Sequence, residues 1–275
     1  MHAVTDLFDG FHRAEFVHDG IGHHYYRAGA GPAVIVIHEV PGIHPGVVAF
    51  ARRVIEAGFT AYLPSLFGQD GREVTGWYTT SAGLRACVSR EFTIFATGRT
   101  SPVVAWLRAL AAKAHEECGG PGVGAVGMCF TGGFALGMMV DERMLAPVLS
   151  QPSLPFAVTA RQKAAIGIGP ADLARVKQRA ADGACLLGLR FTGDGFVPAE
   201  RFETLRRELG DAFVAVEIDS SPGNPHGIPK DAHSVLTVHL VDEPGHPTRA
   251  ALDQVLTLFR TRLVQTPDPT PDPVP

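Results

Sequence analysis

Short apolar runs alternate along the chain with segments in which apolar residues recur at helical spacing. The runs 33–39 (AVIVIHE) and 123–128 (VGAVGM) are rich in β-branched or small apolar residues, a pattern typical of strands buried on both faces of a parallel sheet. Segment 45–58, which ends at a glycine, predicts an amphipathic helix. By the same criteria we expect further strands at 59–64, 144–155, 163–169, 185–194 and 212–219, and further helices at 102–117, 132–142, 170–183, 198–210 and 247–263.

This alternation of strands and helices predicts a doubly wound, mostly parallel sheet flanked by helices, which is an α/β fold. Residues 15–28 mix aromatic and polar side chains around Gly20 and Gly22 and predict an antiparallel hairpin at the N-terminal side. Because neither a linker nor an internal repeat interrupts the pattern, we expect one domain over residues 1–264.

Two segments fall outside the strand and helix pattern. Residues 65–100 are weakly periodic and contain Trp77 and Tyr78, and we interpret them as a long excursion and a candidate lid. Residues 265–275 (QTPDPTPDPVP) are rich in proline and have almost nothing to bury, so we expect a disordered tail.

The composition narrows the class of protein. The 275 residues include 24 basic and 28 acidic side chains, for a net charge of −4, and no basic block suggests nucleic acid or an anionic membrane as a partner. The N-terminus lacks the layout of a secretory signal, and no apolar stretch approaches the ~20 residues of a membrane span. The four cysteines are far apart and form no C-x-x-C pair, which argues against a disulfide framework or a zinc site. We expect a reduced, cytoplasmic protein.

One segment, 124–133 (GAVGMCFTGG), places a cysteine among glycines directly after a predicted strand. A nucleophile on a sharp strand-to-helix turn presents its side chain beyond the carboxyl ends of the strands, where α/β proteins bind ligands. Gly127 and Cys129 match the first half of G-x-nucleophile-x-G, whereas Thr131 stands at the second glycine position and Gly132 follows it. We interpret Cys129 as a nucleophile.

Other motifs of catalytic or cofactor-binding sites are incomplete. Gly122, Gly124 and Gly127 have the spacing of a dinucleotide-binding fingerprint, but they precede and lie within the strand instead of opening the helix. His38 and His115 are each followed by glutamate, yet neither is followed by the second histidine of H-E-x-x-H. The sequence therefore gives no indication of a metal or a cofactor.

The remaining cysteines lack a flanking motif, and we expect them to be buried as small apolar side chains: Cys87, Cys118 and Cys185. A cysteine glutaminase also mounts its nucleophile on such a turn, but it places a His-x-Glu pair later in the chain. No histidine after Cys129 has glutamate two positions on, which argues against this class.

A cysteine nucleophile needs a base, and that base needs a group that orients it. In the α/β-hydrolase order, the acid and the histidine follow the nucleophile after later strands. Asp194 ends the predicted strand 185–194 and is a candidate acid. Spacing alone does not choose among the four histidines between the last strand and the last helix, which are His226, His233, His239 and His246.

Four segments together resemble the dienelactone hydrolase family, which are cysteine hydrolases of the α/β-hydrolase fold. The segments are VIVIHEVPG with Glu39, GMCFTGG with Cys129, GDGFVP with Asp194 and DAHSVLT with His233, and they occur in the family's order. The resemblance implies that His233 is the catalytic histidine, with His226 as the second choice, and that Asp194 orients it.

The resemblance also implies roles for three further positions. Glu39 would contact the resting thiol and help to move its proton, and the backbone N–H groups of Val40 and Phe130 would form the oxyanion hole. The implied activity is hydrolysis of a small-molecule ester or lactone through a thioester on Cys129, without a cofactor. A non-catalytic or redox-sensing protein on the same fold is the alternative, and nothing in the sequence indicates the oligomeric state.

The sequence departs from the family at the substrate-binding positions. Members that act on the carboxylate-bearing dienelactone hold that carboxylate with arginines, one of them four residues after the histidine, where this chain has Thr237. The other would fall within 65–100, where the available arginines are Arg72, Arg85 and Arg90. We therefore consider an ester or lactone of another shape, including a neutral one, as plausible a substrate as dienelactone.

Overall fold

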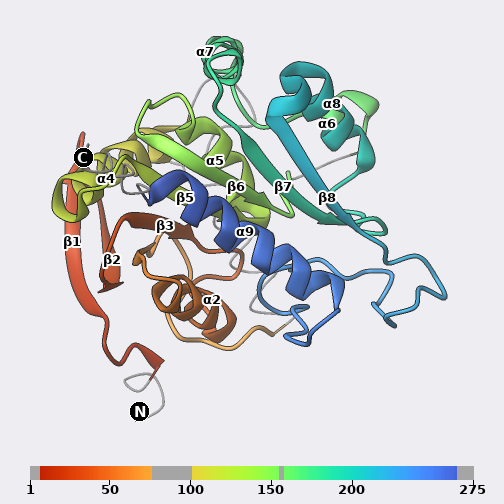
Figure 1. Cartoon of the computed structure of the whole chain (residues 1–275), viewed down its shortest axis with the longest axis horizontal. Helices are drawn as coiled ribbons and strands as arrows, with labels where there is room; N and C mark the ends of the chain where they lie inside the picture. Colours follow the sequence, from red (N-terminus) through yellow and green to blue (C-terminus); the bar gives the residue numbers. More distant parts are fainter. Residues whose placement is uncertain (1–6, 76–100, 155–157, 265–275) are drawn as a thin grey trace, which may run out of the picture.

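A computed structural model describes residues 7–75, 101–154 and 158–264 of the chain. Most of the candidate lid (76–100) and the whole of the predicted tail (265–275) lie outside these described residues. Within the described part, the strands form one sheet in the order β1-β2-β4-β3-β5-β6-β7-β8 (Figure 1). Their bounds are β1 His12–His18, β2 Ile21–Gly29, β3 Ala33–Ile37, β4 Thr60–Pro64, β5 Val123–Met128, β6 Met144–Ser150, β7 Leu186–Phe191 and β8 Phe213–Ile218.

The sheet is antiparallel at one edge and parallel elsewhere. Strands β1 and β2 form a hairpin, and β2 pairs antiparallel with β4. From β4 to β8 all neighbouring strands run parallel, so their carboxyl ends meet at one edge of the sheet. The predicted N-terminal hairpin and mostly parallel sheet are confirmed.

Helices cover both faces of the sheet, as the alternation of strands and helices predicts. Helices α2 (Pro45–Glu56) and α9 (Pro247–Leu263) lie on one face, and α4 (Pro102–Cys118), α5 (Gly132–Met138) and α8 (Ala199–Leu209) lie on the other (Figure 1). Helix α7 (Pro170–Ala181) precedes β7. No helix in the described ranges has the length and apolarity to span a bilayer.

The central strand β3 shows why a continuous apolar run is needed between two helical layers. All five of its side chains are buried. Val34 and Val36 pack in the cluster that includes α2 and α9, whereas Ile35 and Ile37 pack in the cluster that includes α4 and α5. In a strand that is covered on both faces every side chain is buried, so apolar and polar residues do not alternate along it.

One predicted strand is wrong and three predicted elements are too long, one of them the strand predicted at 185–194, which spans only Leu186–Phe191. Residues 163–169 form no strand: the short helix α6 (Ala160–Ala164) is followed by irregular backbone up to the start of α7, because β7 already occupies the place beside β6. The strand predicted at 144–155 ends at Ser150, since Gln151 has a positive φ of 37°. The helix predicted at 132–142 ends at Met138.

Candidate active site

Cys129 directly follows β5 and is the first residue of the 3₁₀ turn η2 (Cys129–Thr131), which leads into α5. Its φ is 53°, in the left-handed region that non-glycine residues seldom adopt. Gly127 is required two residues before it, because a Cβ there would lie 2.3 Å from the carbonyl oxygen of Thr131. The strained turn places Cys129 at the carboxyl edge of the sheet and has the geometry of a nucleophile elbow.

Thr131, which departs from the expected glycine, is accommodated and fully buried. Its hydroxyl accepts a hydrogen bond from the N–H of Met128 at 3.0 Å and lies 3.0 Å from the carbonyl oxygen of His38 at the end of β3. The close backbone approach occurs one residue later, where a Cβ on Gly132 would lie 2.6 Å from Cα of Pro152. The threonine at this position therefore links the ends of β3 and β5, and the turn keeps its shape.

His233 pairs with Asp194, as the resemblance implies. Nδ1 of His233 lies 2.6 Å from Oδ2 of Asp194, whose other oxygen accepts the N–H of Phe196 at 2.9 Å. The Asp194 side chain is 1% exposed and that of His233 is 18% exposed. Burial opposes the charge on His233, but the sulfur of Cys129 and the Asp194 carboxylate outweigh it and raise the pKa of the imidazole well above its usual value.

The other histidines of the same loop have different contacts. His239 folds back so that its Nδ1 accepts the N–H groups of His233 at 3.3 Å and Ser234 at 3.2 Å. Burial, and then the positive charge of His233, lower the pKa of His239, which keeps that nitrogen unprotonated. His246 caps the N-terminus of α9 and its ring packs edge-on against His226, 5.2 Å between centroids.

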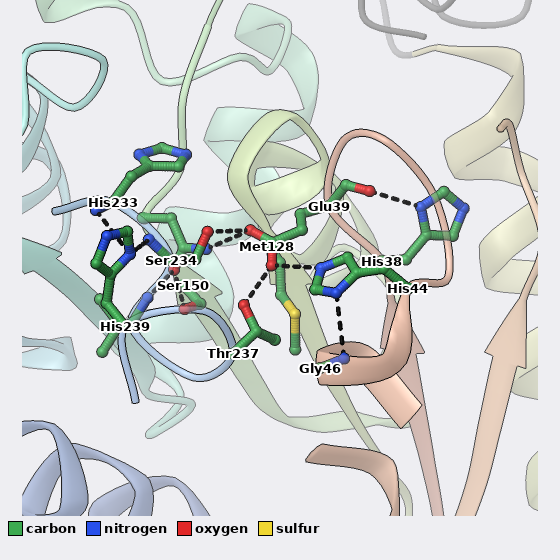
Figure 2. Close-up of polar contacts among 12 residues, drawn as sticks. His38, Glu39, His44, Gly46, Met128, Ser150, His233, Ser234, Thr237 and His239 are labelled. Carbon is green, nitrogen blue, oxygen red and sulfur yellow. Dashed lines mark hydrogen bonds and ion pairs between the residues drawn. The ribbon is translucent and has the colours of Figure 1, made fainter. Parts of the chain in front are cut away.

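Glu39 lies at the centre of a buried hydrogen-bond network (Figure 2). Oε1 accepts from Nε2 of His44 at 3.0 Å and from the hydroxyl of Thr237. Oε2 accepts from the hydroxyl of Ser234 at 2.6 Å and from the amide of Gln151 at 3.1 Å. Burial opposes ionisation of Glu39, but the bonds from His44, Ser234 and Thr237 outweigh it and lower the pKa of the carboxyl.

The thiol of Cys129 has a different partner. Its Sγ lies 3.2 Å from Oγ of Ser153, and either atom can donate. Among the described residues no hydrogen bond joins this sulfur to the Glu39 carboxylate, although both groups line the same cavity. The structure thus brings Cys129, His233, Asp194 and Glu39 to one edge of the sheet, with Glu39 bonded to other groups.

The cavity beside Cys129 has a volume of about 400 Å³. Polar groups of the network line its floor, and its apolar lining consists of Val40, Val74, Phe130, Leu154, Phe196 and Val238. Ile37 of β3 is aligned with Gly127 of β5. The predicted oxyanion-hole residues come three positions later on each chain segment, Val40 after Ile37 and Phe130 after Gly127. The sheet register therefore brings their backbones to the cavity together.

The charged side chains considered as substrate anchors do not line this cavity in the described part of the chain. Arg72 is exposed and bonds to the side chain of Gln69, and Arg85 and Arg90 lie outside the described residues. No arginine or lysine occurs among the described lining residues. The described residues also contain no group of three histidine, cysteine or acidic side chains placed to bind a metal ion.

Several residues of the site were not predicted from the sequence. His44 precedes Pro45, which marks it as a helix cap and not as a partner of Glu39. Gln151 and Ser153 stand in an irregular segment after β6, where no motif distinguishes them. Ser234 lies in the segment DAHSVLT and His239 is one of the four candidate histidines, but the sequence does not indicate that they contact Glu39 or the backbone of His233. The positive φ of Gln151 is the one local feature that would have pointed to a special position, and it is visible only in the structure.

Known proteins share this architecture. The profile of the dienelactone hydrolase family matches residues 22–263. No curated protein matches the sequence. Among solved structures, the dienelactone hydrolase-like promiscuous phosphotriesterase P91 from metagenomic libraries is 17% identical and has a TM-score of 0.59, with 92% of this chain and 98% of that chain covered.

Two further structures have the same fold. The dienelactone hydrolase from Anabaena variabilis is 15% identical, with a TM-score of 0.55 and coverage of 92% of this chain and 98% of its own. The 2,6-dihydroxy-pseudo-oxynicotine hydrolase is 16% identical, with a TM-score of 0.57 and coverage of 92% and 70%. At these identities the likeness is one of fold, whereas the profile match spans most of the chain. The protein is therefore a hydrolase of the dienelactone hydrolase family, built on the α/β-hydrolase fold.

Proposed function

We propose that the protein hydrolyses small, uncharged esters or lactones through a thioester on Cys129. The observation that supports this most directly is the placement of the Cys129 turn beside His233, whose imidazole is bonded to the buried carboxylate of Asp194. The imidazole of His233 can take the proton of the Cys129 thiol as the sulfur attacks, so this pair provides an activated nucleophile.

The acylation step uses this pair directly. The sulfur of Cys129 attacks the carbonyl carbon, a C–S bond forms, and the carbonyl oxygen becomes an oxyanion held by the N–H groups of Val40 and Phe130. Such donors are worth about 3 kcal/mol each in a transition state. When the tetrahedral intermediate collapses, the C–O bond to the leaving group breaks and His233 gives its proton to the departing alkoxide.

The deacylation step reverses these roles. His233, now neutral and still held by Asp194, takes a proton from a water molecule as the water attacks the thioester carbon. The C–S bond breaks, the acid leaves, and the sulfur takes a proton back from His233. For a lactone, the leaving alkoxide and the acid are two ends of the same product.

The substrate class follows from the cavity lining. Phe196, Val238 and Val74 are 68%, 55% and 41% exposed, so apolar surface surrounds the site and suits an apolar acyl or alkyl group. The Glu39 carboxylate lines the cavity, the imidazole of His233 is already paired with Asp194, and the described lining offers no arginine or lysine to a substrate carboxylate. An uncharged ester fits these groups better than an anionic one.

The decisive test is Cys129→Ala with a neutral chromogenic ester such as p-nitrophenyl acetate. We expect turnover to fall about 1,000-fold or more, because the covalent step is lost. Rapid-quench mass spectrometry of the wild type should detect an acetyl adduct on Cys129. Cys185→Ala, which removes a thiol outside this cavity, is the matched control and should retain activity. Retained turnover in Cys129→Ala would refute the mechanism, and reversible oxidation without turnover in the wild type would favour a redox-sensing protein.

A further inference from the structure

All acceptor positions of the Glu39 carboxylate are occupied. An ionised carboxylate offers about four lone-pair sites. Two on Oε1 are taken by His44 and Thr237, and two on Oε2 by Ser234 and Gln151. The thiol of Cys129 could bond to Glu39 only if one of these four donors were displaced.

The donors to Glu39 are uncharged. The hydroxyls and the amide are neutral by nature, and the tautomer of His44 follows from its second contact. Nδ1 of His44 accepts the N–H of Gly46 at 3.2 Å, so the ring proton is on Nε2, which donates to Glu39 (Figure 2). A carboxylate that accepts four hydrogen bonds is stabilised in its ionised form and has a low affinity for a further proton.

Three connections lead from Glu39 to the residues that follow His233. Ser234 and Thr237 bond to the carboxylate directly. Gln151 bonds to it through its amide nitrogen, while its amide oxygen accepts the N–H of Val235 at 3.3 Å. The segment 234–237 is therefore held at three points to a carboxylate at the end of β3.

We propose that Glu39 is a positioning residue: its carboxylate fixes segment 234–237, and through this segment the imidazole of His233, and it does not take the proton of Cys129. The inference rests on the proposed hydrolase function. It differs from the role that the family resemblance implies, in which Glu39 contacts the resting thiol. His239 completes the arrangement from the other side, since its Nδ1 holds the N–H groups of His233 and Ser234.

The substitution Thr237→Val separates the two roles, because it removes one connection and leaves the carboxylate in place. Positioning predicts that kcat falls about 10-fold with KM within twofold, since small misplacements of a catalytic group are costly. Thr237→Ser restores the hydroxyl and should recover most of the loss. If Glu39 instead served the thiol, Thr237→Val would free an acceptor position, and an unchanged or higher kcat would overturn the proposal.

The pH dependence distinguishes positioning from general loss of stability. If the imidazole of Thr237→Val moves away from Asp194 and Cys129, the pKa of His233 falls towards its usual value, and the alkaline limb of the pH–rate profile shifts to lower pH. Thr60→Val is the matched control, because it removes a buried hydroxyl that bonds to Gly31, at the opposite end of the sheet. An alkaline limb that stays in place in Thr237→Val, or shifts equally in Thr60→Val, would contradict the proposal.

A double-substitution cycle supplies the second measurement. If Glu39 acts through Ser234, then Glu39→Gln combined with Ser234→Ala should be less than about threefold slower than Glu39→Gln alone. Fully multiplicative losses would overturn the proposal. Hydrogen exchange at 233–239 should rise in Thr237→Val and Ser234→Ala relative to Thr60→Val. That measurement does not depend on turnover, so a failure of the hydrolase assignment and a failure of positioning are distinguishable.

Discussion

A buried histidine beside the site, His38, has a hydrogen-bond partner for each ring nitrogen, and these partners fix its tautomer. His38, which directly precedes Glu39, is fully buried. Its Nδ1 donates to the carbonyl oxygen of Glu39 at 3.0 Å, and its Nε2 accepts the N–H of Leu66 at 3.1 Å. Burial, as the largest effect, lowers the pKa of His38 to about 4. The neutral ring therefore joins the end of β3 to the segment after β4.

This tautomer predicts a dependence of stability on pH. Between pH about 6.5 and about 4 the unfolded chain protonates residue 38 and the folded chain does not, so the free energy of unfolding falls as the pH falls through this window. The contribution is about 3 kcal/mol over the whole window. Urea denaturation from pH 7 to pH 4.5 should show a shallower dependence for His38→Gln than for the wild type. The exposed His12→Gln should behave as the wild type does, and equal slopes for all three proteins would contradict the tautomer.

At the scale of elements, the turn between β5 and α5 depends on close backbone contacts. Gly127 stands where a Cβ would lie 2.3 Å from the carbonyl oxygen of Thr131, and Gly132 where it would lie 2.6 Å from Pro152. Neither of these glycines has a positive φ; Cys129 adopts that conformation instead. The glycines thus provide space, and the strain is carried by the nucleophile.

We expect Gly127→Ala to destabilise the fold by about 2–3 kcal/mol, because the carbonyl of Thr131 belongs to the backbone of the turn and cannot move away cheaply. Gly195→Ala is the control, since this glycine also adjoins a proposed catalytic residue but has no atom within 4 Å of a Cβ. Chemical denaturation of both variants compares the effects. A Gly127→Ala variant as stable as Gly195→Ala would show that the turn is less constrained than the contacts indicate.

The elements themselves were largely predictable from local patterns, and their side-chain partners were not. Apolar runs predict β3 and β5 because both strands are buried on both faces. The run 163–169 misleads because small apolar residues suit a strand only where a neighbouring strand is available. Arg201 lies on a polar helix pattern, yet it is 2% exposed and bonds to the carbonyl oxygens of Pro152 and Ala165. Such contacts depend on packing between distant segments.

At the scale of the whole molecule, the site is assembled from the ends of β3, β5, β6 and β7 and from the loop before α9. The glycine pattern alone indicates Cys129, because its turn is local. His233 could be separated from three other histidines only through the family resemblance, since the loop path decides which one meets Asp194. The network around Glu39 joins three segments, 39–44, 151 and 234–237, and no pattern within one segment indicates its partners in the other two.

The assembled site predicts selectivity between neutral and anionic esters. Its floor has the Glu39 carboxylate, whose donors are uncharged, and its described lining has no arginine or lysine. Two like charges at about 7 Å and an effective dielectric constant of about 20 repel by about 2.4 kcal/mol, which corresponds to about 50-fold in rate. We therefore expect kcat/KM for p-nitrophenyl pentanoate to exceed that for mono-p-nitrophenyl succinate, of similar size, by at least about 10-fold.

Glu39→Gln provides the internal comparison for this selectivity. The substitution slows both esters by displacing His233, but the ratio of their kcat/KM values cancels that common loss and retains the electrostatic part. The ratio should therefore fall in Glu39→Gln, and added salt should change it less than the substitution does, because the charge is buried. If the wild type hydrolyses the anionic ester as fast as the neutral one, then the carboxylate-bearing substrate has a cationic partner in the site, and the assignment to uncharged esters is wrong.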